Sequence, residues 1–149
     1  MALEEYKKLR DFEKTTEPKG GTKKGAGTIF VVHEHNATRL HYDLRLEMGG
    51  VLRSWAVPKE PPDTEGVKRL AIQTEDHPIE YADFEGSIPE GMYGAGTVRI
   101  WDKGRVTIEE EKDDELLFEL AGRRLNGKYA LIKTRFRGKE SWLFFKRKS

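Results

Sequence analysis

The sequence feature that most restricts the fold is a strict alternation of polar and apolar residues from Arg39 to Glu47. The even positions of this run are all Leu or Tyr, whereas the odd positions are Arg, His, Asp and Glu. A period of two places successive side chains on opposite faces of a β-strand, so the pattern predicts a strand with one face in the core. The other face carries imidazole, carboxylate and guanidinium groups in a row, and this combination needs a chemical explanation.

Most of the remaining chain also has the character of short strands. They are separated by Gly- and Pro-rich turns, and Gly49-Gly50 is a typical two-residue hairpin signal. Such a series predicts a mainly β fold, a small antiparallel β-barrel of about eight strands that is closed or nearly closed. The further predicted strands are 28–35, 51–57, 67–75, 97–104 turning into 105–111, 115–122, a segment 123–134 with a turn at Asn126-Gly127, and 140–147.

The chain of 149 residues is predicted to be a single domain. Residues 1–27 are interpreted as a short N-terminal helix, with its amphipathic pattern at 3–14, followed by a flexible linker. Residues 28–149 are assigned to the barrel. The stretch 76–96 is rich in Gly and Pro and carries five acidic residues. A loop of this length within a compact domain is usually functional.

Composition excludes some classes of protein. The absence of cysteine excludes disulfides and thiolate metal sites. No segment has the apolar run of a signal peptide or a membrane span, so a cytoplasmic protein with no membrane partner is predicted. The net charge of +1 gives no bulk attraction to nucleic acid.

The histidines are concentrated in one region of the sequence. His33, His35 and His41 lie within nine residues, on two strands predicted to be neighbours. If these strands pair, imidazoles converge with Asp43 on one patch, a ligand set that suits a divalent transition metal. The fourth histidine, at the end of another predicted strand, could join the same patch. An arginine on the polar face next to such a site could bind an anionic group in bidentate fashion.

The same residues also allow a purely structural interpretation. Histidines on a polar strand face are often only solvated, and Asp43 with Arg45 or Arg39 could form a surface ion pair contributing less than about 1 kcal/mol. The tryptophans are interpreted as packing residues of the barrel rather than as platforms for nucleic-acid bases. They are Trp55, Trp101 and Trp142.

Several long strings together resemble one family, the 3′-phosphoesterase domain of bacterial DNA ligase D and its free-standing archaeal relatives. The similarity covers nearly the whole chain, from about Leu9 to the C-terminal "WLFFKRK". It implies a small β-barrel with flanking helical elements. The strings are "LRDFEKTTEP", "HNATRLHYDLRLE", "LRSWAVPKEP" and "EDHPIEYADFEGSIPEGMYGAGTVRIWDKG".

The resemblance implies a hydrolase that heals DNA 3′ ends during repair by non-homologous end joining. Such an enzyme removes a 3′-terminal ribonucleoside from a primer strand, leaving a 3′-phosphate, and then hydrolyses this phosphate to a 3′-hydroxyl. The expected cofactor is Mn²⁺ or a similar divalent metal such as Co²⁺. The expected partner is a DNA primer–template that ends in a 3′-ribonucleotide or a 3′-phosphate, and a separate DNA ligase and polymerase are further candidate partners.

The resemblance also assigns roles to individual residues. It implies that His35, Asp43 and His77 bind the metal and that His41, Arg45 and Tyr81 bind the substrate phosphate. His41, Arg45, Tyr81 and His77 are the expected catalytic residues. His41 is in addition a candidate general acid, because imidazole titrates near neutral pH. Residue 33 departs from the family pattern, in which glutamine is common. The supporting residues are Arg10, Asp11, Glu17, His33, Lys59 and Glu75.

Two other classes of function are compatible with the pattern. A non-catalytic β-barrel that binds nucleic-acid ends would bind less tightly as salt increases and would not depend on metal. A different metal phosphohydrolase would act on free mononucleotides as readily as on a primer terminus.

Overall fold

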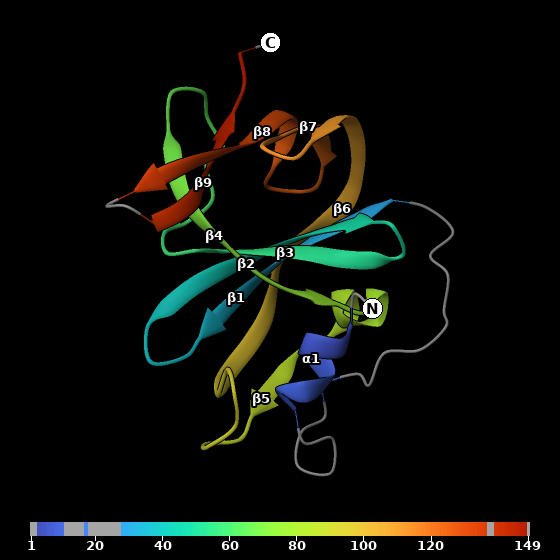
Figure 1. The fold of residues 1–149 in the computed structure, drawn as a ribbon, viewed down its shortest axis with the longest axis vertical. Coiled ribbons are helices and arrows are strands. Elements are labelled where there is room, and N and C mark those ends of the chain that lie inside the picture. The colour runs from blue at the N-terminus through green and yellow to red at the C-terminus, as the bar shows by residue number, and fades with distance from the viewer. Residues whose placement is uncertain (1–2, 11–16, 18–27, 137–138, 149) are drawn as a thin grey trace.

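The computed structural model describes residues 3–10, 17, 28–136 and 139–148. Within these residues, one short helix precedes nine strands, and a 3₁₀ helix lies between the fourth and fifth of them (Figure 1). The elements are α1 (Glu4–Lys8), β1 (Ile29–Asn36), β2 (Leu40–Met48), β3 (Val51–Val57), β4 (Lys68–His77), η1 (Ile79–Asp83), β5 (Gly86–Ile88), β6 (Gly96–Lys112), β7 (Glu115–Ala121), β8 (Asn126–Phe136) and β9 (Lys139–Lys146).

The strands form one antiparallel sheet that closes on itself (Figure 1). The order is β1-β2-β3-β4-β9-β8-β7-β6-β5, and β1 pairs additionally with β6. Eight strands therefore make a ring, and β5 extends the sheet from β6 outside that ring. The mainly β fold, the barrel and the short N-terminal helix are confirmed.

The β2–β3 hairpin has the predicted two-residue turn. Met48 pairs with Val51, and Gly49 and Gly50 both have positive φ, at 62° and 85°. Glycine adopts this left-handed region at little cost, which is why the Gly-Gly pair indicated the turn. The turn sets the register of the hairpin, and this register aligns Arg45 with Ser54.

The turn predicted between 97–104 and 105–111 is wrong, because β6 is one continuous strand of 17 residues. Its first part pairs with β1 and its second part pairs with β7, with Arg105 in both ladders. Gly104 is needed for close packing rather than for a turn: a Cβ there would lie 2.1 Å from the carbonyl oxygen of Ala121. Hydrogen bonds to two neighbouring strands thus outweigh the local turn signal.

The turn predicted at Asn126-Gly127 is also wrong. Asn126 pairs with Ala121 and begins β8, so the chain reverses in residues 122–125. The carboxylate of Asp102 on β6 organises this reversal by accepting hydrogen bonds from the backbone N–H groups of Arg123 (2.9 Å), Arg124 (3.2 Å) and Leu125 (2.9 Å). The turn therefore depends on a residue that is distant in sequence.

Two hydrophobic clusters lie on opposite faces of the sheet. The larger fills the barrel and contains the apolar face of β2, including Leu44 and Leu46, as its alternation predicted. Trp55 and Trp142 are buried in it and Trp101 packs against it, which confirms their packing role. The smaller cluster lies outside the barrel, where α1 and η1 contribute Tyr6, Tyr81 and Ala82. The polar face of β2 points to this outer side.

The N-terminal helix is shorter than predicted. The predicted helix covered 3–14, whereas α1 ends at Lys8 and residues 11–16 lie outside the described residues. The stretch 76–96 is divided among η1, β5 and a turn that precedes β6. Within the described ranges, no helix has the length and hydrophobicity needed to span a bilayer.

Candidate active site

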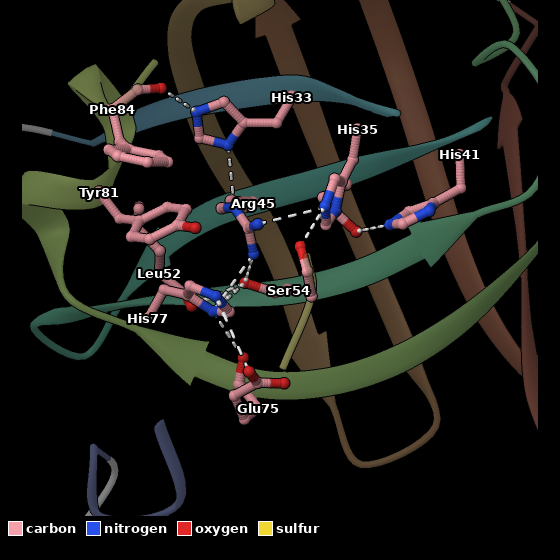
Figure 2. A network of polar contacts seen from close by, with 12 residues as sticks. His33, His35, His41, Arg45, Leu52, Ser54, Glu75, His77, Tyr81 and Phe84 are labelled. Carbon is pink, nitrogen blue, oxygen red and sulfur yellow. Dashed lines mark hydrogen bonds and ion pairs between the residues drawn. The ribbon is translucent and has the colours of Figure 1, made fainter. Parts of the chain in front are cut away.

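The polar faces of β1 and β2 combine to form the site. In the antiparallel ladder His33 pairs with Asp43, and His35 pairs with His41. Directly opposite residues of such a pair project to the same face of the sheet. Figure 2 shows His35 and His41 side by side, with Arg45 between them and the group formed by His77 and Glu75.

Three of these side chains could hold a metal ion together, and we call His35, His41 and Asp43 the metal-type group. One ligand atom from each of His35, His41 and Asp43 lies within 4.8 Å of the others. The carboxylate is placed between the imidazoles, with His35 Nδ1 3.4 Å from its Oδ2 and His41 Nε2 3.2 Å from its Oδ1. Two imidazoles and a carboxylate suit a divalent transition metal.

The surroundings of both imidazoles fit metal binding. The second ring nitrogen of His35 lies 2.7 Å from the carbonyl oxygen of Gly94, and that of His41 lies 3.4 Å from the carbonyl oxygen of Arg39. In a neutral ring whose N–H donates to that carbonyl, the other nitrogen has a lone pair with which it can bind a metal ion beside Asp43. Metal-binding histidines are commonly oriented in this way.

Electrostatics keep Asp43 ionised. Burial by itself would raise the pKa of Asp43, but the Arg45 guanidinium and the hydrogen bonds from His35 and His41 outweigh it and hold this pKa well below its usual value. Conversely, the hydrogen bond to Asp43 raises the pKa of His41. A charged carboxylate is therefore available as a ligand at neutral pH.

Arg45 is the residue that connects the metal-type group to the rest of the site. Its Nε donates to His33 Nδ1 at 3.1 Å, one Nη to Ser54 Oγ at 2.9 Å and the other to Asp43 at 3.4 Å. The guanidinium also lies 4.9 Å above the ring centre of Tyr81. A guanidinium held in this way is a preorganised binding group for a phosphate.

His33 orients Arg45 and is not part of the metal-type group. Its Nε2 lies 3.0 Å from the carbonyl oxygen of Phe84, to which it donates, so Nδ1 is free to accept from Arg45. Burial and the adjacent guanidinium lower the pKa of His33 to about 3. The imidazole is therefore neutral, and a glutamine side chain could make the same two contacts.

His77, which was predicted to bind the metal with His35 and Asp43, lies beside Arg45 and is not part of the metal-type group. Its Nδ1 lies 2.9 Å from the carbonyl oxygen of Glu75 and 3.2 Å from Arg45 Nη1, while Nε2 lies 3.3 Å from Arg10 Nη2. Burial, with the charges of Arg45 and Arg10, holds the pKa of His77 well below its usual value. The position next to His35 and Asp43 is taken instead by His41.

The N-terminal segment covers this part of the site. Arg10 donates to Glu17 at 3.1 Å and to Glu75 at 3.0 Å, and the Tyr81 hydroxyl makes a short hydrogen bond to Glu17. These supporting residues are thus brought together around Tyr81 and His77. Two further residues were predicted to support the site. Asp11 lies outside the described residues, and Lys59 is exposed and does not line the cavity.

A cavity of about 330 Å³ opens onto these groups. Sequence reasoning did not single out Tyr93, which lines the cavity, or Ser54, which accepts a hydrogen bond from Arg45. For Ser54 a signal existed, because the Gly49-Gly50 turn implies that Arg45 pairs with Ser54. The lining residues are Arg10, His35, His41, Asp43, Arg45, Ala56, Thr74, Glu75, His77, Tyr81, Ile88, Tyr93 and Gly94.

Comparison with known proteins identifies the family to which the chain belongs. The profile of the family described as DNA Ligase D 3′-phosphoesterase domain matches residues 33–133. The chain belongs to this family. The matched region contains every member of the metal-type group together with Arg45, His77 and Tyr81.

Its relatives include much longer proteins of DNA end joining. The multifunctional non-homologous end joining protein LigD of Pseudomonas aeruginosa is 50% identical over 155 residues, which covers 98% of this chain. LigD of Mycobacterium bovis is 54% identical over 138 residues, or 89% of the chain, and LigD of Mycolicibacterium smegmatis is 49% identical over 154 residues, or 95%. The chain spans only 18% to 20% of the length of these relatives.

Proposed function

We propose that the protein is a divalent-metal-dependent 3′-phosphoesterase that heals DNA 3′ ends. The observation that carries this proposal is that Asp43, a member of the metal-type group, also contacts the preorganised guanidinium of Arg45. Its oxygens contact His35 and His41 on one side and Arg45 on the other, at 3.2 to 3.4 Å. A phosphate bound between them would contact a metal and a guanidinium at the same time.

In this proposal His35, His41 and Asp43 hold Mn²⁺ or a similar ion such as Co²⁺. When bound, such an ion polarises a phosphoryl oxygen and lowers the pKa of a bound water. With His41 assigned to this group, the groups that remain for the phosphate are Arg45, His77 and Tyr81.

Arg45 would neutralise the negative charge that grows on the phosphate oxygens in the transition state, and its fixed orientation means that little reorganisation is needed. His77, which lies 3.2 Å from a guanidinium nitrogen of Arg45 and 3.3 Å from one of Arg10, would hold these two side chains beside the phosphate. Tyr81, whose ring lies under the guanidinium, would keep Arg45 in place.

The proposed substrate is a DNA primer–template. The enzyme would release a 3′-terminal ribonucleoside, leaving a 3′-phosphate, and would then hydrolyse that phosphate to a 3′-hydroxyl. The family description and the names of the LigD relatives support this assignment and a role in end joining. A separate ligase and polymerase would then act on the healed end. We further propose that residues 1–149 form a single phosphoesterase domain in which residues 28–149 make the barrel.

The deciding experiment uses an end-labelled primer–template with one 3′-terminal ribonucleotide, incubated with the protein and Mn²⁺. Controls are EDTA, an all-deoxy primer and His35→Ala. We expect shortening to a 3′-phosphate end and then to a 3′-hydroxyl end, abolished by EDTA and by the substitution. An intact primer, with binding that persists in EDTA and weakens with salt, would instead favour the non-catalytic end-binding module. Equal hydrolysis of free mononucleotides would favour a general phosphohydrolase.

A second experiment separates metal ligands from phosphate-binding residues. Calorimetric titration with Mn²⁺ should show strongly weakened binding for His35→Ala and His41→Ala. His77→Ala should bind Mn²⁺ like the parent protein and yet lose activity. Loss of Mn²⁺ binding in His77→Ala, with retention in His41→Ala, would restore His77 as the third metal ligand.

A further inference from the structure

Tyr93 is an exposed aromatic residue at the cavity that the chemistry proposed above does not use. Among the described residues, three large hydrophobic side chains are exposed: Leu40, Ile72 and Tyr93. Tyr93 is 50% exposed, and it is the one of the three that lines the cavity. Tyr93 is therefore accessible to a ligand that enters the candidate active site.

The backbone on both sides of Tyr93 is anchored. The preceding residue, Met92, packs against the outer hydrophobic cluster, and its N–H donates to the carbonyl oxygen of Pro89 at 3.2 Å. The N–H of Ala95 donates back to Met92 at 3.1 Å, which closes a second turn. The following residue, Gly94, accepts the hydrogen bond from His35. The ring is thus held at a defined place relative to a candidate metal ligand.

The ring also lies beside Arg10, a cationic residue of the cavity wall. The Arg10 guanidinium lies 5.6 Å from the centre of the Tyr93 ring, and the same side chain contacts His77 and Glu75. An exposed ring next to cationic groups that bind phosphate is the arrangement by which proteins bind single-stranded nucleic acid without reading its sequence.

We propose that Tyr93 stacks on the base of the 3′-terminal nucleotide while the adjacent phosphate occupies the site beside Arg45. The proposal rests on the proposed function and adds a specificity determinant to it. The ring distinguishes a base-bearing nucleotide end from other phosphate esters, and it accepts any base, because every base presents a π-face.

The test measures kcat and KM on two primer–templates, one with a 3′-terminal ribonucleotide and one with an abasic ribose at that position. Tyr93→Leu keeps an apolar side chain without a ring, Tyr93→Phe keeps the ring, and Ile72→Ala is the control for an exposed residue away from the cavity. For Tyr93→Leu we expect KM on the base-bearing primer to rise about ten-fold with kcat nearly unchanged. Tyr93→Phe and Ile72→Ala should match the parent protein, and the abasic primer should not distinguish any of the four proteins.

Other outcomes would overturn the proposal. An equal loss on the base-bearing and abasic primers would make Tyr93 a structural residue of the loop, and an unchanged KM in Tyr93→Leu would exclude stacking. If the parent protein bound these primers without cleaving them, the proposed function would fail, yet dissociation constants for the same proteins and primers from fluorescence anisotropy would still test stacking. Circular dichroism of each variant checks that the fold is intact.

Discussion

At the scale of single residues, the site depends on how Asp43 and His33 orient their neighbours. Asp43 contacts His35, His41 and Arg45, and His33 fixes the guanidinium of Arg45 from the opposite side. Both residues are buried, so their contacts have little exposure to water. Shielded polar contacts are worth more than exposed ones, and removing one partner leaves the others unsatisfied.

Replacing Asp43 tests the metal-type group. Asp43→Asn keeps the shape of the side chain but removes its charge, so we expect Mn²⁺ affinity to fall by more than about 100-fold. Residues that only hydrogen-bond to a metal-binding side chain typically cause smaller losses when they are replaced. Without metal, the pKa of His41 should fall toward its usual value, because the Asp43 hydrogen bond is what raises it. Calorimetry and NMR titration of the histidines measure the two effects. Asp113→Asn, at an exposed position, is the control.

Replacing His33 tests the pH dependence of stability. The unfolded chain protonates this histidine below pH 6.5, whereas the folded protein resists protonation until about pH 3. The unfolded state therefore binds more protons, and the contribution of His33 is complete above pH 6.5 and decreases as pH falls toward 3. His77 and Asp43 also have lowered pKa values and act in the same direction.

His33→Gln should therefore reduce the acid sensitivity without removing it. Glutamine can accept from Arg45 and donate to Phe84 but does not titrate, so the free energy of unfolding should depend less steeply on pH, by up to about one proton. Urea unfolding between pH 7 and pH 4, with EDTA present, measures this. An unchanged pH dependence would mean that His33 has the same pKa in the folded and unfolded states, which would contradict the assignment of a lowered pKa.

At the scale of elements, the long strand β6 links the two halves of the barrel. It pairs with β1 and β7, and its residue Asp102 holds the β7–β8 connection through backbone N–H groups of residues 123–125. A buried carboxylate that accepts several N–H groups satisfies donors that would otherwise be orphaned. One side chain thus stabilises a turn far from it in sequence.

Removal of that carboxylate should destabilise the barrel. For Asp102→Ala we expect the free energy of unfolding to fall by about 3 kcal/mol, because hydrogen bonds to a charged group are lost and buried N–H groups are left unpaired. Asp102→Asn should lose less, since its amide oxygen can still accept. Asp113→Ala, on the exposed β6–β7 turn, is the matched control in chemical denaturation. Equal stability of Asp102→Ala and this control would contradict the assigned role.

At the scale of the whole molecule, the candidate active site lies on the outside of the barrel under a cover formed by α1, Glu17 and η1. Arg10 connects this cover to β4 through Glu17, Glu75 and His77. Glu17 raises the pKa of Arg10 against the effect of burial, so the guanidinium stays charged. The barrel has its own separate interior cluster. The cover and the barrel should therefore respond differently to substitution.

Arg10→Gln tests this separation. It leaves two buried carboxylates without their cation, a change that costs about 3 kcal/mol or more when the structure cannot relax. Because the barrel has its own interior cluster, we expect α1 to detach from it, which would give faster proteolysis of the N-terminal residues and at least about ten-fold lower activity, with thermal unfolding of the barrel nearly unchanged. Lys8→Gln, an exposed charge on α1, is the control. A large drop in the unfolding temperature without faster proteolysis would show that cover and barrel unfold together.

The sequence alone determined the features that arise from local geometry. The period of two assigned the residues of β2 to their faces, because side chains alternate in any strand, and Gly49-Gly50 determined the hairpin and with it the position of Ser54 opposite Arg45. The tertiary structure decided which histidine joins His35 and Asp43, since His41 lies opposite His35 whereas β4 carries His77 toward Arg10. It also decided the continuity of β6 and the place of Tyr93. These features depend on hydrogen bonds and packing between segments distant in sequence, and such contacts can outweigh a local signal.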